Sequence, residues 1–135
     1  SYLNTRGKGK TIYSTLGAKA SEGLSKIHDY EKRVFTRILP LEKSLHMAIE
    51  AGLSPGNITC MQGPFSEELN EAMFRHTGAE ILLTKDSGKA GGFPEKVKAA
   101  EKLGMKVLIL RRPETNPGIT VEEAEDLILK RVRDK

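Results

Sequence analysis

The sequence predicts an α/β domain in which a five-stranded parallel sheet carries helices on both faces, forming a three-layer sandwich. Two observations lead to this prediction. Five short segments rich in Ile, Leu and Val recur about every 23 to 26 residues, which is the length of one strand-plus-helix repeat. The intervals between them have the apolar spacing of amphipathic helices. Strict alternation of strand and helix is typical of parallel sheets.

The five strand segments are short and do not strictly alternate apolar with polar residues. They occupy residues 11–15, 33–39, 57–61, 80–84 and 106–110. Strands that are covered on both faces have this pattern. For five such strands we expect the flavodoxin-like, Rossmann-like order 2-1-3-4-5.

Apolar stripes with helical spacing connect these strands. The first, at residues 18–28, is weak because Gly23 interrupts it. The others consist of Leu41, Leu45, Ala48 and Ile49; Leu69, Ala72, Met73 and His76; Ala99, Ala100 and Leu103; and Val121, Ala124, Leu127, Ile128 and Val132.

Glycine and proline mark the predicted helix ends. Gly52, Gly78 and Gly104 each follow a stripe and precede an apolar residue, as left-handed C-caps do. Pro94 suits the first turn of its helix. Residues 120–123 (Thr-Val-Glu-Glu) begin with Thr and end with Glu, which is the pattern of a capping box.

Composition indicates one soluble globular domain, residues 1–135, with 38% hydrophobic and 30% charged residues. The longest apolar runs, such as residues 107–110, are too short to cross a membrane, and the polar, basic residues 1–10 show no secretory signal. The single cysteine, Cys60, excludes an internal disulfide and a cysteine metal site, which suits the reducing cytoplasm. Residue 1 is serine, so we expect a piece of a longer protein.

The net charge of +4 favours anionic partners. We do not expect nucleic acid among them, because Lys and Arg are spread along the chain and the few aromatic residues form no stacking platform. His28, His46 and His76 fall on helices without a metal-spaced partner, so we expect no metal site. Cys60 lies inside a strand and is expected to be an inert core residue.

Polar residues gather after the strands, where open α/β sheets bind ligands. These positions hold residues 15–19 (Thr-Leu-Gly-Ala-Lys), Thr36 with Arg37, residues 62–66 (Gln-Gly-Pro-Phe-Ser), residues 85–92 (Lys-Asp-Ser-Gly-Lys-Ala-Gly-Gly), and Arg111 with Arg112. The loops that precede the strands are short and plain. This asymmetry predicts an anionic, hydrogen-bonding ligand at one edge of the sheet.

The loop at residues 85–92 combines three glycines, two lysines and a serine ahead of a helix. Close backbone approach, positive charge and a helix N-terminus together suit a carboxylate or phosphate. The alternative is a flexible glycine turn with solvated lysines. In residues 62–66, Pro64 stiffens the backbone and Ser66 is a helix cap, while Phe65 is equally suited to a flat ligand or to its own helix.

These motifs resemble those of the precorrin-6A reductases. The resemblance rests on residues 61–66 with 68–70, on 84–89 with 91–93 and Lys96, on 37–40 and on 111–113. Residues 15–19 resemble the family's Thr-Thr-Gly-Ser-Lys but depart from it at Leu16 and Ala18. The Met-Gln pair at the start of residues 61–66 looks more like the cobalt-precorrin branch. The resemblance covers nearly all of this chain but only the C-terminal half of a family member.

The resemblance implies an NADPH- or NADH-dependent oxidoreductase of cobalamin biosynthesis that acts on a CH–CH group. It would transfer a hydride to the macrocycle of a tetrapyrrole polycarboxylate, precorrin-6A or cobalt-precorrin-6A. The missing N-terminal Rossmann-like half would supply much of the cofactor site, so we expect the isolated chain to be inactive. The alternative is a non-catalytic flavodoxin-like module that binds a small anionic ligand or a partner.

The resemblance and the loop chemistry together nominate site residues. Ser87 is the expected catalytic residue, which positions the macrocycle or passes a proton; the alternative is a serine turn that stabilises its loop. Expected substrate contacts are Arg37, Gln62, Gly63, Pro64, Phe65, Lys85, Gly88 and Lys89, and expected cofactor contacts are Thr15, Gly17 and Lys19. Lys19, Arg37, Lys85 and Lys89 are expected to form one positive rim that receives carboxylates.

Overall fold

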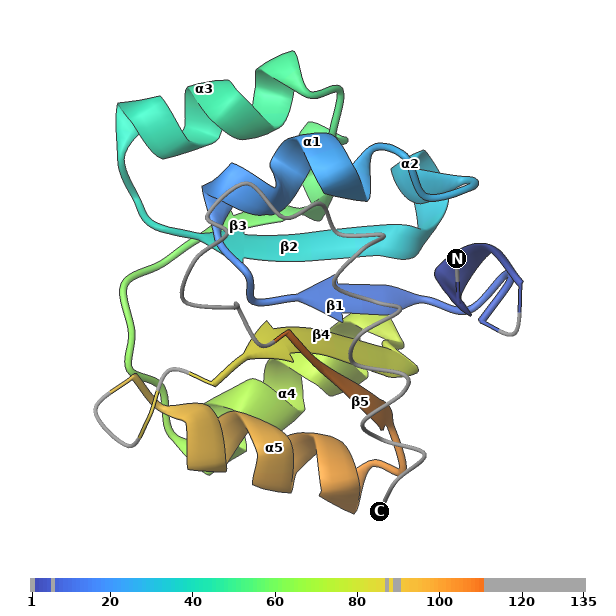
Figure 1. The fold of residues 1–135 in the computed structure, drawn as a ribbon. Helices are drawn as coiled ribbons and strands as arrows, with labels where there is room; N and C mark the ends of the chain where they lie inside the picture. The colour runs from blue at the N-terminus through green and yellow to red at the C-terminus, as the bar shows by residue number, and fades with distance from the viewer. Residues whose placement is uncertain (1, 6, 87, 89–90, 111–135) are drawn as a thin grey trace.

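A computed structural model of the chain confirms the α/β class. It describes residues 2–5, 7–86, 88 and 91–110. Within this part of the chain, five parallel strands form one sheet (Figure 1). The strands are β1 (Ile12–Ser14), β2 (Val34–Ile38), β3 (Ile58–Cys60), β4 (Ile81–Lys85) and β5 (Lys106–Leu110). Each overlaps its predicted segment, because short apolar runs between turn residues are a strong local signal.

The strand order differs from the expected one. The sheet runs β3-β2-β1-β4-β5, whereas 2-1-3-4-5 was predicted. The chain moves outward from β1 to β3 and then crosses back to place β4 beside β1, with Ile12 level with both Val34 and Ile81. Both orders use the same strand-helix alternation, so periodicity does not distinguish them. Burial does: β1 is buried at every position, whereas the edge strand β3 is half-buried to exposed.

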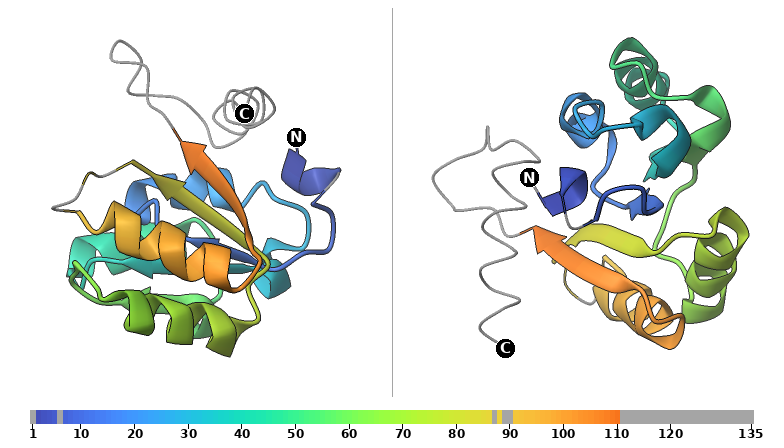
Figure 2. Two further views of the ribbon diagram at one scale, coloured as in Figure 1. Left: turned by 90° about the horizontal axis from the view of Figure 1, so that it is seen from below. Right: turned by 90° about the vertical axis from the view of Figure 1, so that its right-hand side faces the viewer.

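Helices cover both faces of the sheet (Figures 1 and 2). One layer holds α1 (Ser21–Leu24), α2 (Tyr30–Arg33) and α3 (Glu42–Glu50); the other holds α4 (Glu67–Thr77) and α5 (Phe93–Lys102). Short 3₁₀ turns lie at Tyr2–Asn4 (η1), Ala18–Ala20 (η2) and Pro55–Asn57 (η3). The weak helix expected at residues 18–28 is broken into η2 and α1. The helix and capping box expected after residue 120 lie outside the described residues.

Each face of the sheet has its own core. Ile12 of β1 packs with Leu3, Leu24 and Leu83 on the α1–α3 side, while its neighbour Tyr13 faces the α4–α5 side. There Tyr13 joins a second cluster with Leu82, Phe74, Ala99 and Ala100. Successive strand residues point to opposite faces, so one short strand serves both layers.

The predicted helix ends are confirmed. Gly52, Gly78 and Gly104 all have positive φ, between 70° and 95°. Pro94 lies in the first turn of α5. Among the described residues no helix has the length and apolar character that a membrane span needs.

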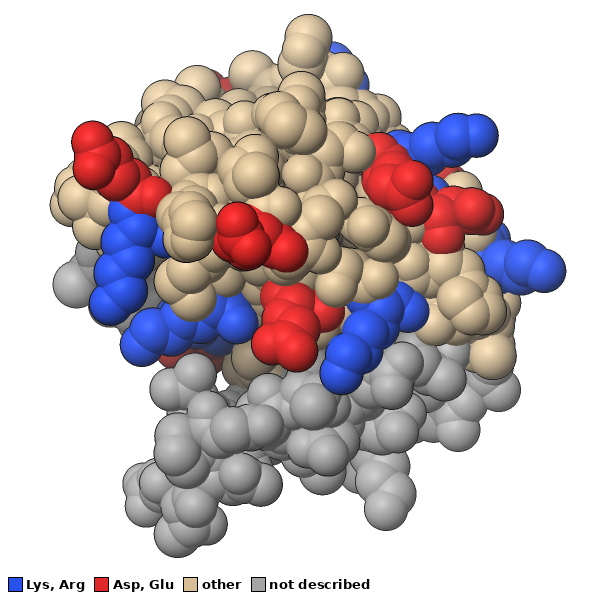
Figure 3. Space-filling view, turned by 90° about the horizontal axis from the view of Figure 1, so that it is seen from above, with Lys and Arg blue, Asp and Glu red and all other residues tan. Residues whose placement is uncertain are grey.

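The apolar stripe predicted on α3 faces solvent rather than the core, except at one residue. Of its four members only Ala48 is buried, while Leu45 and Ile49 are exposed by 41% and 42% and Leu41 by 55%. Figure 3, which looks onto the α3 side of the molecule, shows uncharged surface there, bordered by acidic and basic side chains. Cys60 is also exposed rather than in the core, because it ends the edge strand β3.

Arg33 was expected at the start of a strand but is the last residue of α2 and is buried. Its guanidinium donates to four backbone carbonyls at 2.7 to 3.0 Å, those of Leu3, Gly7, Lys10 and His28. Charge-assisted hydrogen bonds of this kind let a buried cation keep its charge. They also tie the N-terminal segment to α2.

Candidate functional site

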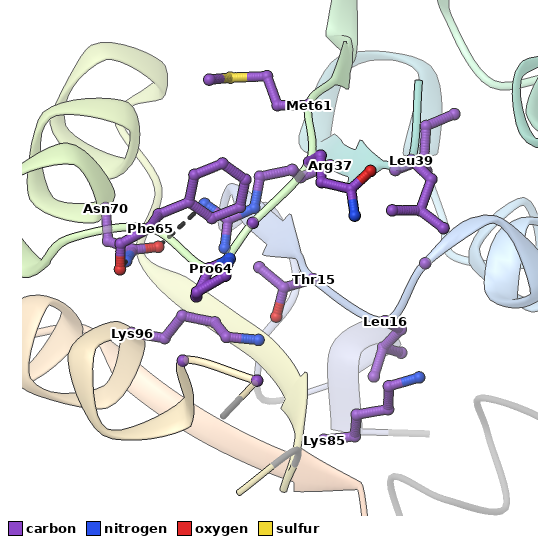
Figure 4. A pocket seen from close by; sticks show the side chains of 16 residues that line it. Thr15, Leu16, Arg37, Leu39, Met61, Pro64, Phe65, Asn70, Lys85 and Lys96 are labelled. Carbon is purple, nitrogen blue, oxygen red and sulfur yellow. Dashed lines mark hydrogen bonds between the residues drawn. The ribbon is translucent and has the colours of Figure 1, made fainter. Parts of the chain in front are cut away.

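A pocket of about 350 Å³ opens at the carboxyl ends of the strands (Figure 4). Four of the strand-end segments and two helices line it. Its lining residues are Thr15, Leu16, Gly17, Arg37, Ile38, Leu39, Met61, Gln62, Gly63, Pro64, Phe65, Asn70, Lys85, Gly91, Gly92 and Lys96. The sheet order explains the location. Strands β2 and β3 are added on one side of β1 and strands β4 and β5 on the other, and the loops after β1 and β4 diverge to leave a crevice.

Most of the residues nominated from the sequence meet at this pocket. Thr15, Gly17, Arg37, Gln62, Gly63, Pro64, Phe65 and Lys85 line it. Lys19 and Gly88 are exposed and do not. Ser87 and Lys89 lie outside the described residues, as do Arg111 and Arg112.

Arg37 is not on an exposed rim, as was expected, but is buried with 6% of its surface accessible. Its Nη1 donates to Asn70 Oδ1 at 2.9 Å, and the Phe65 ring covers it with 4.0 Å between the guanidinium carbon and the ring centroid (Figure 4). The Tyr13 ring lies 5.9 Å away on another side. Burial lowers the pKa of Arg37, but an arginine remains charged in proteins. The guanidinium is therefore a fixed positive charge in the wall of the pocket.

Phe65 makes a contact that the sequence did not predict. Its ring stacks on Arg37, a cation–π contact, and stays half-buried. Gly63 makes this position possible, since a Cβ at Gly63 would lie 2.9 Å from Phe65 Cε2. The Gly63–Pro64 peptide bond is cis. Gly63 is thus required for close approach between backbone and ring.

Asn70 holds this arrangement together and was not predicted. It is fully buried in α4, one helical turn after the cap residue Ser66. Its Nδ2 donates to the carbonyl of Ser66 at 2.8 Å and to that of Phe65 at 3.4 Å, while its Oδ1 accepts from Arg37. The predicted cap is confirmed, since Ser66 Oγ accepts from the Leu69 N–H at 3.1 Å. The cap and Asn70 together fix the loop that carries Phe65.

Lys96 is the second residue that sequence reasoning missed as a site. It was noted only as part of a motif, but its side chain reaches from α5 into the pocket toward Pro64 and Thr15 (Figure 4). Only 7% of its surface is accessible. Burial, with smaller contributions from Arg37 and Lys85, lowers the pKa of Lys96 to about 8. Its position three residues after the start of α5 was the available signal.

A side-chain hydrogen bond joins the ends of β1 and β4 beside the pocket. Thr15 Oγ1 donates to Thr84 Oγ1 at 2.8 Å. Beyond β4, Asp86 Oδ1 accepts from the Gly88 N–H at 3.0 Å, so an aspartate turn orders the beginning of the glycine-rich loop. Gly92 ends this loop with φ 77°, at the N-cap of α5.

The pocket is electropositive. Arg37, Lys85 and Lys96 are among its lining residues, and none of the described lining residues is Asp or Glu. In the part of the chain that the structure describes, no three His, Cys, Asp or Glu residues lie close enough together to hold a metal ion. The arrangement therefore suits an anionic organic ligand, held by cations and by the backbone of the strand-end loops.

These features define a Rossmann-like α/β domain with a cationic ligand pocket at the point where the strand order reverses. Comparison with known proteins identifies the family. The chain belongs to the precorrin-6x reductase CbiJ/CobK family, whose model matches residues 2–129.

Three curated relatives are cobalt-precorrin-6A reductases. The protein from Methanothermobacter thermautotrophicus is 42% identical over 108 residues, which cover 76% of this chain and 36% of the relative. Those from Methanococcus maripaludis and Synechocystis are 37% and 34% identical, over 88% and 91% of this chain but 46% and 49% of their own lengths. The chain thus spans less than half of these relatives.

A solved structure shares the fold. The chain of a CobK precorrin-6A reductase aligns with a TM-score of 0.60 and 19% sequence identity. The alignment covers 90% of this chain and 48% of that one. At this identity the similarity supports the architecture alone.

Proposed function

We propose that this chain forms the tetrapyrrole-binding half of an NADH- or NADPH-dependent precorrin-6A reductase, with cobalt-precorrin-6A as the preferred substrate. The single observation that carries the proposal is the pocket whose described lining residues include three cations and no carboxylate, in a chain whose relatives are cobalt-precorrin-6A reductases. A tetrapyrrole intermediate of cobalamin biosynthesis carries many acetate and propionate side chains. Such a ligand complements an electropositive pocket.

The pocket accommodates part of such a ligand. Its volume of about 350 Å³ is near the lower limit for small-molecule sites. Exposed Leu39 and Met61 extend the pocket outward as an apolar surface that suits the face of a flat macrocycle. We propose that the other half of the protein completes the site and supplies most of the contacts to the nicotinamide cofactor.

The proposed division of labour leaves the redox chemistry to the cofactor. The nicotinamide, when bound, supplies the hydride to a conjugated carbon of the macrocycle. This chain binds the acid groups of the substrate with Lys85 and Arg37 and orients the ring against Phe65. Ser87 and Lys89 in the glycine-rich loop remain proposed substrate contacts, and Thr15, Gly17 and Lys19 proposed cofactor contacts.

Turnover tests the proposal. NADH and NADPH oxidation should be followed with cobalt-precorrin-6A, for the 135-residue chain and for a protein of full family length that contains it. We expect turnover from the full-length protein only. Ser87→Ala should lower that turnover at least about tenfold, or about 1.4 kcal/mol in the barrier, with little change in stability. Ser25→Ala, at a half-buried serine outside the pocket lining, is the matched control. Absence of turnover in the full-length protein would refute the proposed activity.

A further inference from the structure

Lys96 is a largely buried lysine whose positive charge is not balanced by a described neighbour. A buried cationic side chain is normally neutralised by a carboxylate or hydrogen-bonded to carbonyls, as the Arg33 guanidinium is. Among the described residues, Lys96 takes part in no ion pair and no side-chain hydrogen bond. The charged groups that face it are also cations, Arg37 from β2 and Lys85 from β4. Repulsion among these three cations destabilises the protein when the pocket is empty.

The acidic groups on the packed elements do not compensate Lys96. On α4, Glu67 pairs with Lys102 at 3.2 Å and Glu71 pairs with Arg75 at 3.4 Å. On α5 itself, the buried Glu95 Oε2 lies on the side of Gly92 and within no ion-pair distance of Lys96.

The remaining neighbours are not acidic. On β1, Tyr13 lies next to Arg37, and burial raises the pKa of its phenol, which keeps it neutral. From β5, Lys106 stacks on the Tyr2 ring. Within the part of the chain that the structure describes, no carboxylate pairs with Lys96.

The position of Lys96 fits one oxyanion. Its side chain points into the pocket beside Pro64, and Gly91 and Gly92 line the same wall at the start of α5 (Figure 4). Gly92, the N-cap of this ten-residue helix, makes no side-chain cap hydrogen bond. An anion here would meet the Lys96 ammonium, whereas the Glu95 carboxylate already lies beside Gly92 at the N-terminus of α5.

We propose that Lys96 anchors one carboxylate of the tetrapyrrole at the inner end of the pocket. The inference rests on the proposed function and deepens it by assigning a residue to the acid groups of the substrate. The same oxyanion chemistry could come from a phosphate of the dinucleotide cofactor. The substrate is favoured because the lining of this pocket holds more of the proposed substrate contacts (Arg37, Gln62, Gly63, Pro64, Phe65 and Lys85) than of the proposed cofactor contacts (Thr15 and Gly17).

Proton uptake gives this site a measurable signature. A carboxylate beside Lys96 raises the pKa of the ammonium above the value of about 8 in the empty pocket. Between these two values each bound ligand takes up one proton, so affinity falls by up to about tenfold for each pH unit. Below pH 8 the ammonium is already protonated, and affinity through this group is constant.

Binding of uroporphyrin, a tetrapyrrole whose side chains are all carboxylic acids, tests the proposal. Fluorescence anisotropy would give its dissociation constant for the chain at pH 7, 8 and 9.5. The porphyrin carboxylates stay ionised throughout, so any pH dependence belongs to the protein. We expect the affinity of the unchanged chain to fall about tenfold between pH 8 and 9.5.

Two variants make the test specific. Lys96→Met should weaken binding at pH 7 at least tenfold and remove the dependence on pH. Lys98→Met, an exposed lysine on the same helix, should leave both unchanged. A Lys96→Met chain that binds as the unchanged chain does, or keeps its pH dependence, overturns the proposal, as does an unchanged chain that does not bind uroporphyrin.

A parallel titration with NADP⁺ distinguishes the source of the oxyanion. Loss of NADP⁺ affinity in Lys96→Met, with uroporphyrin binding intact, would assign the site to the dinucleotide and refute the substrate assignment. Failure of the proposed function has a different readout, which is nicotinamide oxidation by the full-length protein. The two ideas can therefore fail separately.

Discussion

Replacement of Asn70 by alanine removes the central hydrogen-bond partner of the pocket wall. The amide accepts from the buried Arg37 guanidinium at 2.9 Å and donates to the Ser66 carbonyl at 2.8 Å. A hydrogen bond to a charged group contributes about 1.5–3 kcal/mol, and a neutral one about 1 kcal/mol. Since Asn70 is fully buried, water does not replace either bond. We expect Asn70→Ala to lower the free energy of unfolding by about 3 kcal/mol.

Urea denaturation followed by circular dichroism measures this loss. Asn57→Ala is the matched control, because Asn57 Nδ2 donates a single bond to the Glu31 carbonyl at an exposed site. It should cost less than about 1 kcal/mol. Arg37→Met in the Asn70→Ala background should cost less than in the unchanged chain, with a coupling energy of about 1–3 kcal/mol. Equal losses for the two asparagines, or additive losses in the double variant, would refute the role assigned to Asn70.

Two further predictions concern the same pocket. Gly63→Ala should displace the Phe65 ring, destabilise the chain by about 1–2 kcal/mol and speed the modification of Arg37 by phenylglyoxal. Gly56→Ala is the control and should change neither stability nor modification rate, because a Cβ at Gly56 meets nothing within 4 Å. An unchanged modification rate in Gly63→Ala would contradict the role assigned to Phe65. Lys96→Met should make the chain more stable at pH 7 by about 1–2 kcal/mol, because the lowered pKa of about 8 marks an unfavourable charge that solvent in the open pocket partly screens. Between pH 8 and 10.5 the unfolded chain binds more protons than the folded chain, so the unchanged chain gains stability as pH rises. The stability difference between Lys96→Met and the unchanged chain should therefore shrink over this range, which urea titrations would measure. A variant less stable than the unchanged chain at pH 7 would show that the ammonium is not an unfavourable charge.

The elements of the fold could be predicted because their signals are local. Each strand is a short apolar run between turn residues, and Gly78 or Gly104 marks a helix end within one turn of the chain. The order of the strands is not local, since two crossover patterns satisfy the same alternation. The stripe on α3 is likewise correct in its spacing, but spacing does not determine which side of a helix is covered.

The pocket could be located from the sequence but not built from it. Residues after parallel strands meet at one edge of a sheet, which brought Arg37, Phe65 and Lys85 together as expected. From sequence alone, a charged residue at the end of a strand is expected to be exposed unless its partner is known. The partner of Arg37 is Asn70, 33 residues later and on the opposite side of the loop. Lys96 is an ordinary helix residue in sequence, and only packing shows that it is buried.

The contacts of Arg33 determine how this domain can be cut and joined. Two of the four carbonyls around its guanidinium belong to Leu3 and Gly7, and a third belongs to Lys10. A recombinant or chimaeric protein that starts after residue 10 would keep the arginine and lose three of these acceptors. Of these four acceptors the buried guanidinium would keep the His28 carbonyl alone, a far greater loss than a missing surface loop. Residues 2–10, which contribute no strand to the sheet, therefore belong to the smallest unit that can be exchanged between proteins without unfolding it.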